Sequence, residues 1–452
     1  MVNSAACSGV SVSCGGIVFP QDRWHDRLAN GGVDPVTLDL PLLRPFAALR
    51  PTPAYAAAVV APPYDVLTSE EARQQVIGKP YSFLHVSKAE IDLPQGTERY
   101  APAVYAKAAE NLHNFVSRGV LVQECKPCFY IYRLKTATHT QTGIAGAAAV
   151  NAYEAGRIRR HELTRPDKES DRVCQIEAVD AHTGPVLAAY HPVPMVTDLV
   201  ERITTTRPLL AVSDPDGVDH ILWRVSQEAD IAVLLAAFAT MPALYIADGH
   251  HRSAAAARVA AARRALNPCH RGDEMYNSFL LVSFPTEELV ILHYNRVVCD
   301  LNGLNRDTFL ARVAESCTIV PCAQPTERTT RGEVRLYLPG QWYRLVWHST
   351  LEETADPVAQ LDVTRLTDII FSPVLGLTNL RQDRRIDFVS GVRGFSALEQ
   401  RVDSGEMAVA FVTHPPTIKE LIAVTDTGQS MPPKSTWFEP KLADGLLSLP
   451  LG

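Results

Sequence analysis

Features of membrane, secreted and disulfide-rich proteins are missing from this sequence. No apolar run is long enough to span a membrane, and residues 1–16 lack the basic start and continuous apolar core of a secretory signal. The nine cysteines form no dense framework, and the only C-x-x-C, at Cys125 and Cys128, precedes a strand-like segment instead of the helix of a redox motif. We therefore expect a cytoplasmic protein in which these two cysteines are reduced and structural.

Common nucleotide-binding and nucleic-acid-binding motifs are also missing. The sequence contains neither a G-x-x-x-x-G-K-[ST] phosphate loop nor the glycine loop of protein kinases, because Gly143–Gly146 lacks the lysine. The net charge is −7, which gives no general attraction for nucleic acid or a membrane surface. We also find no helix-turn-helix with a basic recognition face. A site for phosphate groups would have to be built from other motifs.

The length of 452 residues predicts about three domains. Strand-like and helix-like segments occur in both halves of the chain without internal repeats, which favours an α+β fold. We expect a poorly structured N-terminus, an N-terminal lobe, a core that carries the site and a C-terminal α+β lobe, over residues 1–40, 41–120, 121–275 and 276–452, respectively.

Local patterns place the main elements of these lobes. Short apolar runs bounded by proline or glycine indicate strands, and polar caps before amphipathic runs indicate helices. Thr68, for example, precedes two glutamates in a typical capped helix start. Strands are expected over 56–60, 128–134, 142–152, 244–247, 278–284, 289–298, 334–338 and 343–347, and helices over 104–118, 167–181, 250–266 and 306–317.

The most informative stretch is Asp248-Gly249-His250-His251-Arg252, between the strand 244–247 and the helix 250–266. Asp248 is placed to cap the new helix, and Gly249 lets the backbone come close to a ligand. Free amides at a helix start attract anions, and here two histidines and an arginine stand beside them. The turn therefore predicts a phosphate site.

Two other interpretations of this turn remain open. Asp-Gly is a common turn before a helix, so the motif could be purely structural, and the histidines would then be surface side chains. Asp248, His250 and His251 are also metal-ligand types. Adjacent residues on a helix point about 100° apart, however, so two neighbouring histidines rarely bind one ion, which argues against zinc.

A second motif lies upstream, between Gly156 and Ser170. Several cationic side chains surround Glu162 there, which favours its ionised form. Such a carboxylate can accept a proton from a hydroxyl while the arginines neutralise a transferring phosphate. The alternative is a solvated, salt-bridged loop that leads into the helix 167–181. The cationic residues are Arg157, Arg159, Arg160, His161, Arg165 and Lys168.

A third motif, Met431-Pro432-Pro433-Lys434-Ser435-Thr436, lies near the end of the chain. The paired prolines stiffen the loop, and the next three residues offer one cation and two hydroxyls. That set suits the oxygens of a phosphate or of an amino-acid carboxylate. A structural turn is the alternative interpretation.

The three motifs, in this order, resemble those of the free L-serine kinases in the ParB/sulfiredoxin-like superfamily. The resemblance implies a ParB/sulfiredoxin-like catalytic core between an N-terminal and a C-terminal α/β lobe. It implies Glu162 as catalytic base, Asp248 as the phosphate-side or Mg²⁺-binding acid, and O-phospho-L-serine as product. The implied phosphate-binding and substrate-binding residues are Arg160, His161, Arg165, Gly249, His250, His251, Arg252, Lys434, Ser435 and Thr436.

The resemblance leaves the phosphoryl donor open among inorganic pyrophosphate, ATP and ADP, of which we expect pyrophosphate. Two departures accompany it: the segment 184–230 is expected to loop out of the shared core, and Tyr294-Asn295 replaces an expected threonine–histidine pair, which weakens the case for Arg296 as a phosphate ligand. The alternative functions are a ParB-like regulator that binds nucleotide or nucleic acid, and a metabolite-binding protein without turnover.

Overall fold

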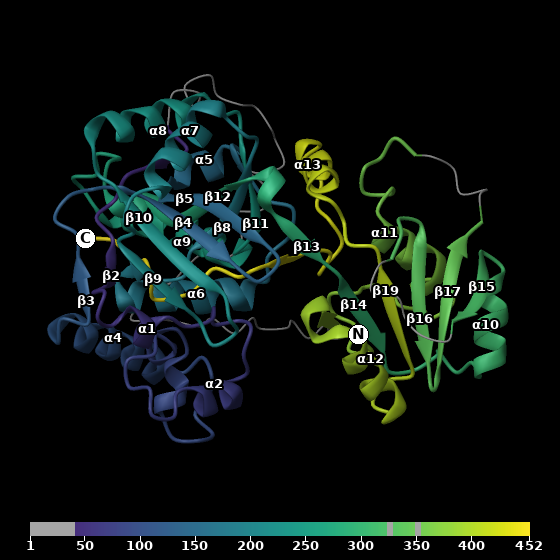
Figure 1. The fold of residues 1–452 in the computed structure, drawn as a ribbon. Helices are drawn as coiled ribbons and strands as arrows, with labels where there is room; N and C mark the ends of the chain where they lie inside the picture. The colour runs from purple at the N-terminus through teal and green to yellow at the C-terminus, as the bar shows by residue number, and fades with distance from the viewer. Residues whose placement is uncertain (1–40, 323–328, 349–353) are drawn as a thin grey trace, which may run out of the picture.

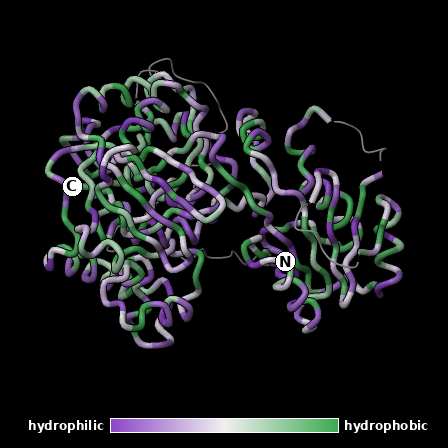
Figure 2. Tube along the Cα trace, in the orientation of Figure 1, coloured by the Kyte–Doolittle hydropathy of each residue, from purple (hydrophilic) through white to green (hydrophobic). Residues whose placement is uncertain are grey.

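The computed structural model describes residues 41–322, 329–348 and 354–452 and has two lobes (Figure 1). The larger lobe is built on one mixed sheet with helices on both faces, and the smaller lobe on a second sheet. Hydrophobic stretches concentrate inside each lobe, whereas the outer loops are mainly hydrophilic (Figure 2). In the described part of the chain, no helix is long and apolar enough to cross a membrane.

The sheet of the larger lobe has the strand order β6-β11-β8-β12-β5-β4-β10-β9, with β1 paired to β5. Most neighbours are antiparallel, while β11–β6 and β12–β8 are parallel. The strands are β1 (Leu43–Arg44), β4 (Phe129–Lys135), β5 (Thr140–Ala149), β6 (Ile158–Arg159), β8 (Val186–Tyr190), β9 (Leu210–Ser213), β10 (Asp219–Val225), β11 (Leu244–Asp248) and β12 (Ser278–Pro285).

Helices bury the two faces of this sheet because the central strands are apolar on both sides. One face packs against α7 and α8, and the other against α6 and the C-terminal tail, while α9 contributes alanines to both cores. The helices are α5 (Val150–Glu154), α6 (Pro166–Val179), α7 (Pro194–Thr204), α8 (Glu228–Thr240) and α9 (His250–Leu266), with the 3-10 turns η3 (Met275–Asn277) and η4 (Thr286–Glu288).

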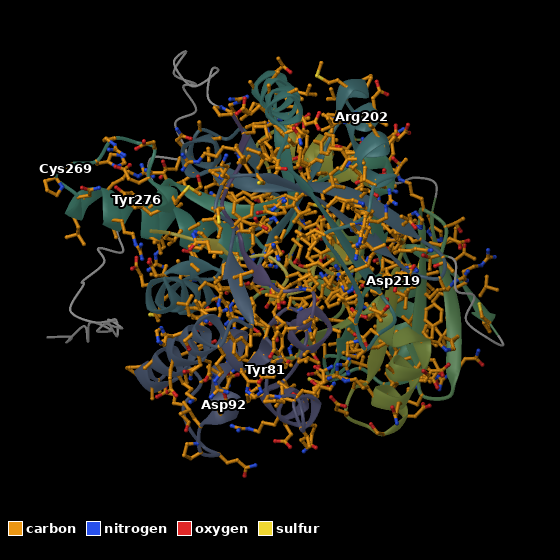
Figure 3. All side chains as sticks on the ribbon, turned by 60° about the vertical axis from the view of Figure 1, so that its left-hand side comes forward. Tyr81, Asp92, Arg202, Asp219, Cys269 and Tyr276 are labelled. Atoms are coloured by element: carbon orange, nitrogen blue, oxygen red, sulfur yellow. The ribbon has the colours of Figure 1, made fainter. Side chains whose placement is uncertain are left out.

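A small helical part with its own hydrophobic cluster lies beside the sheet. Thr68 caps α2 as expected, and with Glu71 it forms a capping box. Tyr81 and Asp92 of this part lie at the opposite end of the larger lobe from Arg202 on α7 (Figure 3). The elements are β2 (Leu49–Pro51), α1 (Ala56–Val59), α2 (Ser69–Gln75), α3 (Leu84–Ser87), η2 (Ala89–Asp92), α4 (Pro102–Ser117) and β3 (Leu121–Gln123).

The smaller lobe is an antiparallel sheet of order β15-β17-β16-β19-β14-β18. One face packs against α10 and α11, and the other against α12. The elements are β14 (Tyr294–Val298), α10 (Arg306–Ala314), β15 (Cys317–Cys322), β16 (Glu333–Leu338), β17 (Gln341–Trp347), α11 (Asp362–Leu366), the π-helix η5 (Thr367–Phe371), β18 (Ile386–Ser390), η6 (Gly391–Arg393), α12 (Gly394–Asp403) and β19 (Val409–Thr413).

After the smaller lobe, the chain returns to the larger one (Figure 1). Helix α13 (Ile418–Asp426) packs on the core of the larger lobe through Leu421 and Val424. Strand β20 (Trp437–Glu439) then pairs with β13 (Val290–Leu292) between the lobes. The last strand, β21 (Leu449–Pro450), pairs with β7 (Ala181–His182), so the tail ends inside the larger lobe.

The observed arrangement differs from the expected lobes at two boundaries. Residue 276, the expected start of the C-terminal lobe, precedes β12, which pairs with β5 and β8 in the main sheet. The tail after Ile418 also belongs to the larger lobe. Both boundaries are set by long-range contacts, namely strand pairing and burial of the apolar tail. The sequence near each boundary does not show these contacts.

Several local expectations were wrong. The expected strand 142–152 ends at Ala149, where α5 begins, and the expected strand 289–298 divides into β13 and β14. Residues 56–60, expected as a strand, contain the helix α1, whose alanines favour a helix once the short segment is packed. The segment 184–230 does not loop out of the core, because β8 lies between β11 and β12 and β10 pairs with β4. By contrast, α9 spans the expected 250–266, and Cys125 and Cys128 are both free.

Candidate functional site

The turn from β11 into α9 depends on Gly249. This residue has a φ of 96°, in the left-handed region that favours glycine, and a Cβ there would lie 3.2 Å from Cα of Val186. Gly249 is also the N-cap of α9, and no side chain from the described residues caps the helix. Asp248 is therefore not the cap that we expected. The first-turn amides of α9 stay available to an anion.

The carboxylate of Asp248 points instead at two cations. Its Oδ2 accepts a hydrogen bond from Nη2 of Arg252 at 2.7 Å, and its Oδ1 pairs with Nζ of Lys441 at 3.3 Å. Burial works against the charge, but Lys441 and Arg252 outweigh it and hold the pKa of Asp248 well below its usual range. Asp248 thus stays ionised and orders both cations beside the helix start.

Two buried histidines connect the motifs. Nδ1 of His161 donates to the carbonyl of Ile246 at 2.8 Å, which leaves Nε2 to accept a hydrogen bond from the Thr436 hydroxyl at 3.0 Å. His161 and His250 pack edge to face, with ring centroids 4.4 Å apart. Burial lowers the pKa of each histidine to about 3, so both are neutral at pH 7.

His250 carries an unsatisfied polar atom. Its side chain is buried at the first turn of α9, and within the described ranges its Nε2 has no hydrogen-bond partner. A buried imidazole nitrogen without a partner is costly, so a ligand group at this nitrogen would stabilise the site.

Glu162 is half-buried and lies within the field of His251 and Lys434. Desolvation works against the charge on Lys434, but Tyr294, Glu162 and Asp65 raise the pKa of its ammonium group above the usual value. Burial lowers the pKa of His251, with Glu162 acting in the opposite direction. The site therefore pairs an acceptor carboxylate with a persistent cation.

The other predicted residues of the second motif take different positions. The backbone N–H of Arg165 donates to Nε2 of His251 at 3.1 Å, while its exposed guanidinium pairs with Asp167. Arg160 is half-buried, and its charge acts on His250. The structure thus brings the backbone of residue 165, but not its side chain, to the turn of α9.

The tail motif joins the site through its backbone and side chains. The N–H of Met431 donates to the carbonyl of His161 at 2.8 Å, which aligns the second and third motifs. The hydroxyl of Ser435 donates to the carbonyl of Pro432 at 2.6 Å, so it serves the loop itself. Thr436 donates to His161, while the ammonium group of Lys434 lies over the Tyr294 ring and interacts electrostatically with Glu162.

Sequence reasoning missed Lys441, although it lies within the stretch that carries the third motif. Its Nζ lies 4.4 Å from the ring centroid of Trp437 and pairs with Asp248. Asp65, which follows a pair of prolines and Tyr64 and could on sequence grounds line a pocket or a packing corner, acts electrostatically on Arg252, His251 and Lys434. A lysine four residues after Trp437 gives no local signal of this contact.

Asp444 is a further acidic group at the edge of the site. It is 2% exposed, and its Oδ1 has no hydrogen-bond partner among the described residues. Burial raises its pKa to about 7, against the effect of Arg252. This side chain therefore carries a proton for much of the time near neutral pH.

The side chains fit a bound Mg²⁺ only in part. The described residues contain no group of three or more His, Cys, Asp or Glu side chains that could hold a metal ion. Mg²⁺ often binds proteins through one or two carboxylates and takes its other ligands from phosphate and water. Asp248 is such a carboxylate, but its oxygens already pair with Arg252 and Lys441.

A family model described as "Protein of unknown function (DUF1015)" matches residues 43–364, which is more than half of the chain. The chain belongs to this DUF1015 family. The match begins at β1 and ends in α11, so it includes the first two motifs and stops before the tail motif. No curated protein matches the chain.

Solved structures that resemble this DUF1015 protein are distant. A free serine kinase in complex with AMP has 11% identity and a TM-score of 0.33, and the match covers 67% of this chain and 92% of that one. SbnI from Staphylococcus aureus has 14% identity and a TM-score of 0.35, covering 68% and 87%. A conserved hypothetical protein from Pyrococcus furiosus has 13% identity and a TM-score of 0.33, covering 67% and 94%. At these TM-scores, we base no conclusion on the likeness.

Proposed function

We propose that this protein is a kinase that transfers a phosphoryl group to the hydroxyl of free L-serine and forms O-phospho-L-serine. One observation carries the proposal: Glu162 interacts electrostatically with Lys434 and with His251, which lies in the first turn of α9. The site therefore combines a proton acceptor with donors and cations for phosphate oxygens. The motif resemblance to free L-serine kinases supports the choice of acceptor.

Glu162 is the proposed general base. In the proposed reaction it accepts the proton of the serine hydroxyl while that oxygen attacks phosphorus, and the bond from phosphorus to the donor oxygen breaks. The ammonium group of Lys434 interacts electrostatically with Glu162 and would also act on the phosphate oxygens. His161 is a poor candidate for this role because both of its ring nitrogens are engaged.

The transferring group would lie at the start of α9. Its charge would be stabilised by the first-turn amides, by Lys434 and by Arg160, which act where negative charge develops on the phosphate oxygens. Asp248 does not touch the reacting atoms in this scheme. It orders Arg252 and Lys441 at the border of the site, through contacts of 2.7 Å and 3.3 Å.

We propose inorganic pyrophosphate as the donor, with ATP or ADP as the alternatives. Cations and backbone amides bind phosphate groups of all three donors. Mg²⁺ on the donor phosphates would supply charge neutralisation, and Asp248 would hold it only by giving up its pairing with Arg252 or Lys441. We further propose a ParB/sulfiredoxin-like core, action in the cytoplasm, and a role of the product in serine or cysteine metabolism.

The test is a ³¹P NMR assay of the purified protein with L-serine and Mg²⁺, with pyrophosphate, ADP and ATP in separate tubes. The proposal predicts the O-phospho-L-serine signal in one tube, which also identifies the donor. If no donor gives phosphoserine, the kinase proposal fails. A salt-sensitive shift of DNA would then favour the regulator, and phosphate binding without turnover would favour a metabolite-binding protein.

A further inference from the structure

Arg296 is a fully buried cation of the smaller lobe. It lies on β14, is 1% exposed, and ranks among the largest fully buried side chains. Its Nη1 donates to the carbonyl of Tyr294 at 2.6 Å, and its Nη2 donates to the carbonyl of Lys434 at 3.2 Å. Among the described residues, its hydrogen-bond partners are thus carbonyls and the Thr413 hydroxyl, at 3.5 Å, and not carboxylates.

These contacts exclude Arg296 as a direct phosphate ligand in this arrangement. Both terminal nitrogens are directed at the protein's own backbone, and the side chain is closed off from solvent. Desolvation lowers the pKa of the guanidinium to about 10, so it remains charged at pH 7. A buried charge is costly unless it is hydrogen-bonded, so loss of these contacts would destabilise the arrangement around Arg296.

The group that Arg296 holds is Lys434, whose backbone is unusual. Lys434 has a φ of 56°, in the left-handed region, which is unfavourable for a residue with a side chain. A strained backbone persists only when the surroundings fix it. The hydrogen bond from Arg296 to the Lys434 carbonyl is one such contact.

Tyr294 holds the other end of the same lysine. Nζ of Lys434 lies 5.5 Å from the ring centroid of Tyr294, which is a cation–π contact. The ring itself is fixed edge to face against Trp437, with centroids 5.3 Å apart, and against Phe388, with centroids 6.0 Å apart. Trp437 also lies under Lys441, so one aromatic cluster contacts both lysines of the tail.

We infer that Tyr294 and Arg296 are positioning residues, through which the smaller lobe holds Lys434 in its left-handed conformation with its ammonium group over the Tyr294 ring. Arg296 fixes the backbone of the loop at Lys434, and Tyr294 fixes the ammonium group of the same lysine. The smaller lobe then contributes to the reaction without providing a group that touches the phosphate. The catalytic part of this inference rests on the proposed function, whereas the hold on the loop does not.

Limited proteolysis tests the hold on the loop without any activity. Lys434 is exposed and is followed by serine, so trypsin can cleave after it once the loop leaves its conformation. We expect Tyr294→Leu to accelerate cleavage after Lys434 about tenfold. This factor corresponds to about 1.4 kcal/mol less free energy for opening the loop. Arg296→Met removes the backbone contact and should accelerate it further, and Arg296→Lys should do so less.

Tyr343→Leu is a matched control in the same lobe. Tyr343 is 9% exposed, as is Tyr294, and a cation, Arg306, likewise lies over its ring, at 5.9 Å. General loosening of the smaller lobe would therefore affect both leucine variants, whereas a specific hold affects only Tyr294→Leu. Equal cleavage after Lys434 in wild type, Tyr294→Leu and Arg296→Met overturns the inference, as does equal acceleration by Tyr343→Leu.

Kinetics then test the positioning role. Tyr294→Leu is expected to lower kcat about tenfold with a smaller change in the KM of L-serine, because the lysine acts on the transferring group. Unchanged kcat with faster cleavage overturns the positioning role. If wild type forms no phosphoserine, the proposed function fails, while the proteolysis result still decides whether Tyr294 and Arg296 hold the loop.

Discussion

The turn 248–252 and the tail 431–444 both contribute to the candidate site, but their positions have different origins. The turn joins β11 directly to α9, so its amides and histidines are placed by a strand, a glycine and a helix that are adjacent in sequence. The tail reaches the site only after the chain has formed the smaller lobe and returned along β20 (Figure 1). Local geometry thus sets the anion site, and long-range packing sets its cations.

The two regions also differ in what fixes them. The turn depends on one residue, Gly249, whose left-handed backbone leaves no room for a side chain. The tail is held by a row of leucines in the main core, including Leu442, Leu446 and Leu449. Lys441 contacts Asp248 of the turn directly. Thr436 reaches the turn indirectly, because it donates to His161, which packs against His250. The predictions below test whether the two regions act as one site.

The largest expected effect follows replacement of the proposed base. Glu162→Gln removes the proton acceptor and should lower kcat by roughly 10²–10⁴-fold, because the change spares the phosphate contacts but not proton transfer. Donor binding should stay near wild type by calorimetry. Glu287→Gln, an exposed glutamate on the same lobe, is the control. Nearly normal turnover of Glu162→Gln would show that the base is another group.

The next effect concerns the contact between tail and turn. Lys441→Met removes one of the two ion pairs of Asp248 among the described residues and leaves the pair with Arg252. We expect it to lower kcat/KM for the donor about tenfold. Steady-state kinetics measure this loss. Lys419→Met, on the exposed side of α13, is the matched control. An equal effect of both substitutions would mean that net charge, and not the contact with Asp248, matters.

A smaller effect concerns the pH dependence of stability. The pKa of Asp444 is raised by burial from 3.8 to about 7, so the folded chain binds a proton that the unfolded chain has lost. This group therefore lowers the free energy of unfolding as the pH rises from about 4 to about 7, by up to about 1.4 kcal/mol per pH unit.

The Asp444→Asn variant removes this titration. Its free energy of unfolding in urea should change less than that of wild type between pH 5 and pH 7.5. Asp216→Asn, at an exposed position, should retain the wild-type slope. Parallel pH profiles of wild type and Asp444→Asn would refute the raised pKa of Asp444.

The last prediction is that the protonation state of His161 does not change near neutral pH. Burial lowers the pKa of His161 to about 3, and its Nδ1 proton is donated to Ile246. ¹⁵N NMR of the imidazole should show the neutral Nδ1–H form at every pH between 5 and 8. A titration near pH 6.5 would contradict the link that His161 makes between the second motif and Thr436.

The sequence predicted the first region well because its signals are local. The apolar run 244–247, the glycine and the alanine-rich helix indicated a strand, a turn and a helix, and β11 and α9 confirm them. The expectation that Asp248 caps α9 was wrong, because its carboxylate pairs with Lys441 and Arg252 instead. Local propensity cannot include a partner 193 residues away.

The tail and the sheet order were harder to predict for the same reason. Lys434, Ser435 and Thr436 were recognised as polar residues of a stiff loop, but their separate directions depend on His161, Tyr294 and Pro432. The place of β8 in the middle of the main sheet likewise follows from pairing with β11 and β12. Such pairings are decided by the packed core, and an alternating pattern does not specify the partner strand.

The most direct test of the central claim is the rate of O-phospho-L-serine formation by the double variant Lys434→Met/Lys441→Met, measured by ³¹P NMR beside wild type and Lys419→Met. An unchanged circular dichroism spectrum will show that the double variant is folded. If turn and tail form one phosphoryl-transfer site, this variant should form phosphoserine about 100-fold more slowly than wild type. A double variant that forms phosphoserine at the wild-type rate would contradict the claim that the tail completes the site.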